Sequence, residues 1–237
     1  MRVAIVGYGK MGREVEAALR ERGHEPAVAE RYAFPADCPV GIDFTRGPEV
    51  PANVGRALAA GARYVVGTTG WSDRLGEVRR QVEAARGGLV HAANFSVGVN
   101  LYYRIVGRAA ELLAPFPDYD PYVLERHHRQ KKDAPSGTAK ALAEILRSAS
   151  GGRRHPATTL DGTLPQGAFH VASLRAGAIV GDHTVGFDSG DDEILIEHRA
   201  RSRRGFAQGA VRAAEWIAGR SGFFSFDAVL DELLRGA

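Results

Sequence analysis

Two adjacent histidines and four cationic side chains lie in one short stretch of the chain. Residues 125–138 read Glu-Arg-His-His-Arg-Gln-Lys-Lys-Asp-Ala-Pro-Ser-Gly-Thr. An imidazole can protonate a substrate near neutral pH, and lysine and arginine can bind negative charge. We interpret this segment as a site that binds and protonates a small polyanion, with a solvated basic turn as the alternative.

The end of the same segment predicts a helix start. Ser136 has the position of an N-cap, and Pro135 disfavours helical geometry in the residue before it. The pattern predicts a loop or strand end over 127–134 and a helix from about 137 to 147. Free N–H groups and the positive end of the helix dipole would then add to the anion site.

A second motif, G-x-G-x-x-G, lies near the N-terminus: Gly7-Tyr8-Gly9-Lys10-Met11-Gly12. It stands between an apolar run typical of a buried strand, 2–6, and a predicted helix, 10–22. In such a motif Gly7 permits a tight turn, and Gly9 lets the backbone approach a pyrophosphate. Gly12 lets the helix pack on the strand. This context favours a dinucleotide-binding loop over an ordinary glycine-rich turn.

Three further segments at expected strand ends extend this cofactor site. The second strand ends at Glu30-Arg31, where a carboxylate accepts from the ribose 2′-hydroxyl of NAD and an arginine pairs with the 2′-phosphate of NADP. The two side by side predict use of both NADH and NADPH, with ordinary surface charge as the alternative. Two loops of small residues follow the fourth and fifth strands: Gly67-Thr68-Thr69 and Ala92-Ala93-Asn94-Phe95.

Strand and helix patterns alternate over the first hundred residues, which is typical of a parallel, doubly wound sheet. The ligand crevice of such a sheet lies beyond the carboxyl ends of its strands. The sequence therefore predicts an α/β fold with a Rossmann-like domain. The expected strands are 2–6, 25–30, 40–44, 63–66 and 88–92, and the expected helices are 10–22, 48–60 and 72–86.

The pattern changes after Phe95. Short glycine-containing linkers join the last three strand-like runs and predict an antiparallel meander. With helices over one face, these strands indicate an α+β second domain with a largely antiparallel sheet. The expected elements are helices at 101–113 and 137–147, strands at 119–125, 169–175, 178–187 and 193–200, an extended connection at 151–167, and a returning helix at 206–218.

Composition narrows the class of protein. The chain has 237 residues, a net charge of +3 and one cysteine, Cys38, which excludes an internal disulfide. It has no run of 18 apolar residues, and the apolar run at its N-terminus is too short for a signal peptide. We therefore expect a cytoplasmic protein without membrane partners. Residues 125–135 contain no aromatic side chain, so a nucleic-acid partner is not expected.

Other reaction classes find little support in the residues. His127 and His128 would point to opposite sides of a strand, and 191–193 is a short acidic turn, so no metal site is expected. A nucleophile-elbow motif is missing, which disfavours Ser-His-Asp chemistry. We interpret His183 and His198 as core or sheet-face histidines.

Together these motifs resemble the 4-hydroxy-tetrahydrodipicolinate reductase (dihydrodipicolinate reductase) family. The segment His-His-x-x-Lys-x-Asp-Ala-Pro-Ser-Gly-Thr is highly specific to that family. The similarity runs nearly end to end and covers the N-terminal glycine motif, 42–45, 67–71, 93–100, 125–138, 181–184, 198–216 and 226–233.

The resemblance implies a division of labour along the chain. A dinucleotide-binding domain would comprise 1–95 and 204–237, and 96–203 would form the substrate-binding and tetramerisation domain of a homotetramer. His127 matches the catalytic histidine and Lys131 the catalytic lysine. The matching substrate-binding positions are His128, Gly137 and Thr138. The matching cofactor positions are Gly7–Gly12, Glu30, Arg31, Gly67–Thr69 and Ala92–Phe95.

The family reaction passes a hydride from NADH or NADPH to an unsaturated dicarboxylate ring, after which an acid protonates the neighbouring carbon. An imidazolium with a pKa near neutrality suits that step. The chain is shorter than many family members between Arg31 and Val66, which leaves cofactor preference open. A diaminopimelate or other amino-acid dehydrogenase would lack the His-His-x-x-Lys segment. A nucleotide-sensing protein would have lost Lys131. A reductase acting on another cyclic imine stays open as the alternative.

Overall fold

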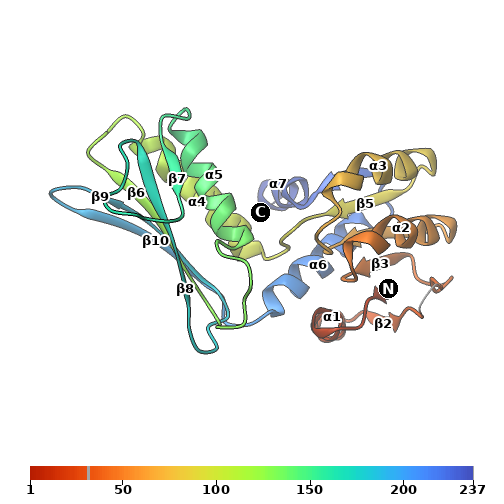
Figure 1. Cartoon of the computed structure of the whole chain (residues 1–237). Helices are drawn as coiled ribbons and strands as arrows, with labels where there is room; N and C mark the ends of the chain where they lie inside the picture. Colours follow the sequence, from red (N-terminus) through yellow and green to blue (C-terminus); the bar gives the residue numbers. More distant parts are fainter. Residues whose placement is uncertain (31–32, 237) are drawn as a thin grey trace. The chain divides into compact units, whose positions relative to one another are not determined.

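In the computed structural model, the described residues are 1–30 and 33–236. The chain divides into two compact units (Figure 1). One unit comprises Met1–Val97 and Arg203–Ala237, and the other comprises Gly98–Ser202. Of the helices in the described residues, none is long and apolar enough to cross a membrane.

The first unit is built on a six-stranded parallel sheet with the order β11-β5-β4-β3-β1-β2. Strand β1 lies between β2 and β3, so the chain turns from one side of β1 to the other. The carboxyl ends of strands at such a reversal form the ligand crevice of doubly wound folds. The strands are β1 (Arg2–Val6), β2 (Glu25–Val28), β3 (Val40–Asp43), β4 (Arg63–Val66), β5 (Gly88–His91) and β11 (Gly222–Ser225).

Helices cover both faces of this sheet, which confirms the doubly wound prediction. Each helix buries one apolar stripe, and these stripes form two separate cores with the sheet between them. One face is covered by α1 (Lys10–Glu21), α6 (Arg204–Ile217) and α7 (Phe226–Arg235). The other is covered by α2 (Val50–Ala59) and α3 (Leu75–Ala84), each preceded by a 3-10 turn, η1 (Gly47–Glu49) and η2 (Ser72–Arg74).

The second unit is built on a five-stranded mixed sheet with the order β10-β9-β6-β8-β7. Helices α4 (Val97–Leu113) and α5 (Gly137–Ala149) pack on one face of it (Figure 1). The strands are β6 (Asp120–His127), β7 (His155–Ala157), β8 (Ala168–Arg175), β9 (Asp182–Asp188) and β10 (Glu193–Arg199).

The predicted meander over 169–200 is wrong. Strand β6 lies between β8 and β9, parallel to β8 and antiparallel to β9. The helix α5 carries the chain from β6 to β7 and β8 in a crossover, which makes these strands parallel. Residues 176–181 then pass from one side of β6 to the other. Of the three strands expected to form the meander, β9 and β10 therefore pair as a hairpin, whereas β8 pairs with neither of them.

Candidate active site

Strand register brings polar side chains from three strands to one buried position. On β6, Val123, Glu125 and His127 share the face covered by helices, because side chains alternate along a strand. Glu125 lies opposite His183 on β9 and opposite Ser173 on β8. The mixed pairing of β6 therefore determines which groups surround the histidine.

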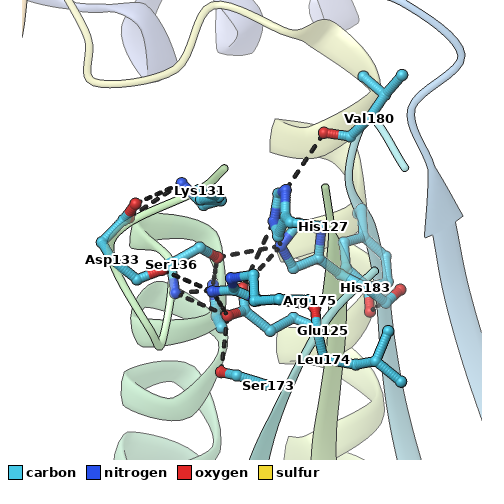
Figure 2. A network of polar contacts seen from close by, with 12 residues as sticks. Glu125, His127, Lys131, Asp133, Ser136, Ser173, Leu174, Arg175, Val180 and His183 are labelled. Atoms are coloured by element: carbon cyan, nitrogen blue, oxygen red, sulfur yellow. Dashed lines mark hydrogen bonds and ion pairs between the residues drawn. The ribbon is translucent and has the colours of Figure 1, made fainter. Parts of the chain in front are cut away.

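Glu125 is completely buried and lies at the centre of this cluster (Figure 2). Its carboxylate accepts hydrogen bonds from the Ser136 backbone N–H at 3.0 and 3.2 Å, from Ser173 Oγ at 2.7 Å and from Arg175 Nη2 at 2.7 Å. Burial raises the pKa of Glu125, but hydrogen bonds from His183, Ser136 and Arg175 outweigh this effect and hold the pKa well below its usual range. Glu125 is thus a buried anion.

Both ring nitrogens of His127 face protein atoms. Its Nδ1 lies 3.2 Å from the carbonyl oxygen of Val180, and its Nε2 lies 3.4 Å from Nε2 of His183 and 3.5 Å from Oε2 of Glu125. Burial, followed by repulsion from His183, lowers the pKa of His127, while Glu125 acts in the opposite direction. The sequence predicted a histidine with a pKa near neutrality. In the structure the pKa is lower than usual, so the neutral ring is favoured more strongly than that prediction implied.

Lys131 lies in the turn that follows β6, and its side chain is 23% exposed. Its Nζ donates to both carboxylate oxygens of Asp133, at 2.8 and 3.0 Å. This hydrogen bond lowers the pKa of Asp133. His128, next to the catalytic candidate, is partly exposed. The turn thus carries a cation and an imidazole that a ligand can reach.

Helix α5 begins where the Pro-Ser-Gly-Thr sequence predicts. Ser136 is the N-cap, and its Oγ accepts from the Ala139 N–H at 3.2 Å. The same Oγ lies 3.2 Å from Nε2 of His183, which joins the helix start to the buried cluster. Gly137 and Thr138 form the first turn, where backbone N–H groups have no partner within the helix and attract anions.

The cluster also contains three residues that can ligate a metal, one carboxylate and two imidazoles, which sequence spacing did not bring together. One donor atom each of Glu125, His127 and His183 lies within 4.8 Å of the others. However, Arg175 already pairs with the carboxylate, and the positive end of α5 points at it. These charges oppose a divalent cation, so the cluster suits proton binding better than metal binding.

In the first unit, the glycine motif adopts the geometry expected for it. Gly7 has a φ of +92°, and a Cβ there would lie 2.8 Å from the carbonyl oxygen of Phe44. A Cβ at Gly12 would collide with the carbonyl oxygen of Gly7. Gly9 caps α1 and has open space beside it. Lys10 and Met11 follow in the first turn of α1, and Met11 packs on the core.

A cavity of about 520 Å³ adjoins this motif. Its lining includes Gly7, Tyr8, Glu30 and Arg46, so the residue expected to bind a ribose borders a space of nucleoside size. The other expected specificity residue, Arg31, lies outside the described residues. The glycine turn, the open backbone at Gly9 and this cavity fit a dinucleotide.

Asp43 organises the loop that carries Thr68, and it was not among the predicted site residues. It is completely buried at the end of β3. It accepts from Thr45 Oγ1 at 2.7 Å, Thr68 Oγ1 at 2.8 Å and Asn53 Nδ2 at 2.9 Å. The Thr68 hydroxyl therefore supports the loop. Gly67, which is partly exposed, and Thr69, which is exposed, flank it, so backbone and the Thr69 side chain are the accessible groups of this loop.

The loop after β5 offers mainly backbone atoms. Phe95 is buried, and its ring lies 4.8 Å from that of Phe226. The Asn94 side chain accepts from the Ser96 N–H at 2.8 Å. Ala92 is partly exposed and Ala93 is exposed. Side-chain recognition of a cofactor by this loop is thus limited to small residues.

Sequence reasoning missed the groups behind His127. A signal for Glu125 existed, because it precedes His127 by two residues on a strand and must share its face. His183 was interpreted as a core or sheet-face histidine, and it is indeed buried on the sheet, but it belongs to the polar cluster. Ser173 and Arg175 gave no signal, because spacing within one strand does not reveal its neighbours.

Comparisons with known proteins agree on one family. Residues 98–230 match the family model described as dihydrodipicolinate reductase, C-terminus, and residues 26–95 match that of its N-terminus. A 4-hydroxy-tetrahydrodipicolinate reductase from Archaeoglobus fulgidus is 37% identical over 96% of this chain and 84% of its own. One from Methanoculleus marisnigri is 45% identical over 76% of this chain and 70% of its own.

Solved structures show the same fold. The dipicolinate-bound dihydrodipicolinate reductase from Paenisporosarcina sp. TG-14 superposes with a TM-score of 0.75 at 23% identity, covering 95% of this chain and 97% of the other. Diaminopimelate dehydrogenase from C. glutamicum, a rival considered above, gives a TM-score of 0.51 at 16% identity, covering 99% of this chain and 98% of the other. With two family models matched along its length, the chain belongs to the dihydrodipicolinate reductase family.

Proposed function

We propose that the protein reduces 4-hydroxy-tetrahydrodipicolinate, by way of dihydrodipicolinate, to tetrahydrodipicolinate with NADH or NADPH, in the biosynthesis of diaminopimelate and lysine. The observation that carries this proposal is the position of His127. Its imidazole lies beside a buried carboxylate at 3.5 Å and precedes a cationic turn and a helix start in the chain. The relative from Paenisporosarcina binds dipicolinate, a planar dicarboxylate of the same size class.

The roles of the residues follow from their chemistry. His127 donates a proton to the carbon next to the one that is reduced, and Lys131 pairs with a carboxylate of the substrate after leaving Asp133. The N–H groups of Gly137 and Thr138, together with His128, bind the second carboxylate. Two carboxylates need countercharge from more than one side, which this segment supplies.

The first unit provides the cofactor site in this proposal. Bound NADH or NADPH supplies the hydride. The Gly7–Gly12 turn binds the pyrophosphate through backbone N–H groups, and Glu30 accepts from the ribose. The 67–69 and 92–95 loops lie against the ribose and nicotinamide through their backbone.

The direct test is oxidation of NADH and NADPH, followed by absorbance, with enzymatically generated 4-hydroxy-tetrahydrodipicolinate. We expect turnover with both cofactors and competitive inhibition by dipicolinate. Oxidation with pyrroline-carboxylate but not with the dipicolinate precursor would instead assign a different cyclic imine as substrate. A His127→Asn variant controls for background oxidation.

The proposal includes a homotetramer in the cytoplasm, where nicotinamide-dependent biosynthesis takes place. Helices α4 and α5 cover one face of the second sheet, and the described residues of the second unit contain no further helix that could cover the other face (Figure 1). Leu174 and Leu195 belong to this open face and are 42% and 55% exposed. Apolar side chains on an open sheet favour pairing with further copies of the chain.

A further inference from the structure

The groups behind His127 have no role in the reaction as proposed above. Both Glu125 and His183 are buried. Oε2 of Glu125 and Nε2 of His183 each lie within 4 Å of His127 Nε2. Burying a carboxylate and two imidazoles together is costly unless their charges and protons are matched. Their arrangement therefore bears on which protons His127 holds.

The hydrogen-bond partners assign the protons of both rings. A carbonyl oxygen only accepts, so the Val180 contact places a hydrogen on Nδ1 of His127. Nε2 of His127 is then the nitrogen that gains or loses a proton. His183 Nε2 faces Ser136 Oγ at 3.2 Å and Glu125 Oε2 at 3.7 Å, whereas its buried Nδ1 has no partner. Its hydrogen thus belongs on Nε2.

One carboxylate oxygen serves both rings. Oε2 of Glu125 lies 3.5 Å from His127 Nε2 and 3.7 Å from His183 Nε2. When His127 becomes an imidazolium, its new N–H and the N–H of His183, which faces Ser136 Oγ at 3.2 Å, both have this oxygen as their nearest carboxylate acceptor. The two donors therefore compete for one acceptor.

We propose that Glu125 and His183 are positioning residues that set the proton affinity of His127 in opposite directions. The Glu125 carboxylate stabilises the imidazolium, and His183 weakens that effect by competing for the same oxygen.

Glu125 supplies the carboxylate that faces the ring, with Oε2 3.5 Å from His127 Nε2, while its Oε1 pairs with Arg175. Arg175 on β8 lies opposite His127 in register, and Lys131 follows in the turn. His183 faces the ring from β9, and α5 contributes the Ser136 hydroxyl to the cluster. Asp133 is already paired with Lys131. Neutralising Glu125 would leave the ring facing only cationic and neutral groups.

NMR titration of histidine-labelled protein without substrate tests the proposal, with a His127→Asn spectrum assigning the signal. We expect the pKa of His127 to fall by about one unit or more in Glu125→Gln and to rise in His183→Gln. Glu193→Gln, which removes a carboxylate that accepts from Tyr122 at the far end of the same sheet, should leave it unchanged. Unchanged titration in both variants, or a shift in the same direction, would overturn the proposal.

Kinetics adds a second readout, and this part rests on the proposed function. In Glu125→Gln we expect the alkaline limb of kcat to move to lower pH, so that acidification restores part of the lost rate, with KM for NADPH unchanged. A role in folding alone would lower kcat equally at every pH. Glu125→Asp should recover the wild-type profile in part. If the wild type reduces no dipicolinate precursor but the titrations shift as expected, the proposed substrate is wrong and the pairing of Glu125 with His183 stands.

Discussion

At the scale of single residues, His127 and Lys131 occupy different surroundings, although only three residues lie between them in the chain. His127 is enclosed by the carbonyl of Val180 and the buried cluster, whereas Lys131 is held by one carboxylate at the surface of the turn. The histidine is therefore oriented before a substrate arrives. The lysine must exchange Asp133 for a substrate carboxylate.

Replacing either residue by alanine should reduce catalysis by a large factor. Loss of a positioned general acid typically costs about 10²–10⁴-fold in rate, so we expect kcat to fall by this order in His127→Ala and in Lys131→Ala. NADH affinity, measured by fluorescence, should hardly change. Lys132→Ala, which removes an exposed neighbouring cation, is the matched control. A His127→Ala enzyme that keeps most of its kcat would refute the assignment.

Cofactor choice is also decided by single residues. With Glu30 beside Arg31, we expect NADH and NADPH efficiencies within roughly tenfold, or ~1.4 kcal/mol. Arg31→Ala should impair NADPH selectively, because NADH has no 2′-phosphate. Glu30 lines the cavity next to the glycine turn, so Glu30→Gln should impair NADH more. Comparing kcat/KM for both cofactors decides the matter, and equal losses in Arg31→Ala would contradict its role.

At the scale of elements, local signals were predicted well and pairings between strands were not. Ser136 and Gly7 act through hydrogen bonds and backbone angles within a few residues, so the sequence predicted the start of α5 and the turn after β1. The place of β6 between β8 and β9 depends on contacts across more than forty residues. This pairing places Ser173 and His183 next to Glu125. The sequence pattern therefore could not predict which residues surround His127.

Asp43 gives a prediction about the loops that follow β3 and β4. Replacing it by alanine removes one acceptor from the buried hydroxyl group of Thr68, the buried amide of Asn53 and the partly buried hydroxyl group of Thr45. Each unsatisfied buried group costs about 1–3 kcal/mol. We expect Asp43→Ala to lower the Tm by several degrees and raise KM for NADH. Asp73→Ala, in the exposed turn η2, should change neither quantity in calorimetry and steady-state assays.

At the scale of the whole molecule, the open face of the second sheet predicts assembly. Light scattering at micromolar concentration should give the mass of a tetramer. A charge on this face, in Leu174→Glu combined with Leu195→Glu, should dissociate it, because exposed apolar side chains there would no longer pack against another copy. Leu112→Glu in α4 is a matched control, because Leu112 is 56% exposed and Leu195 is 55% exposed. A monomeric wild type would contradict the prediction.

The first unit is made of two separated pieces of chain, and this affects the order of folding during synthesis. About half of the larger core of that unit comes from α6 and α7 near the C-terminus, and β11 completes the edge of the sheet. The second unit is one continuous segment, Gly98–Ser202. On the ribosome its sheet and helices can assemble first, while the N-terminal strands wait for the last residues to leave the exit tunnel. We therefore expect the unit that carries His127 to complete its fold before the glycine-motif unit.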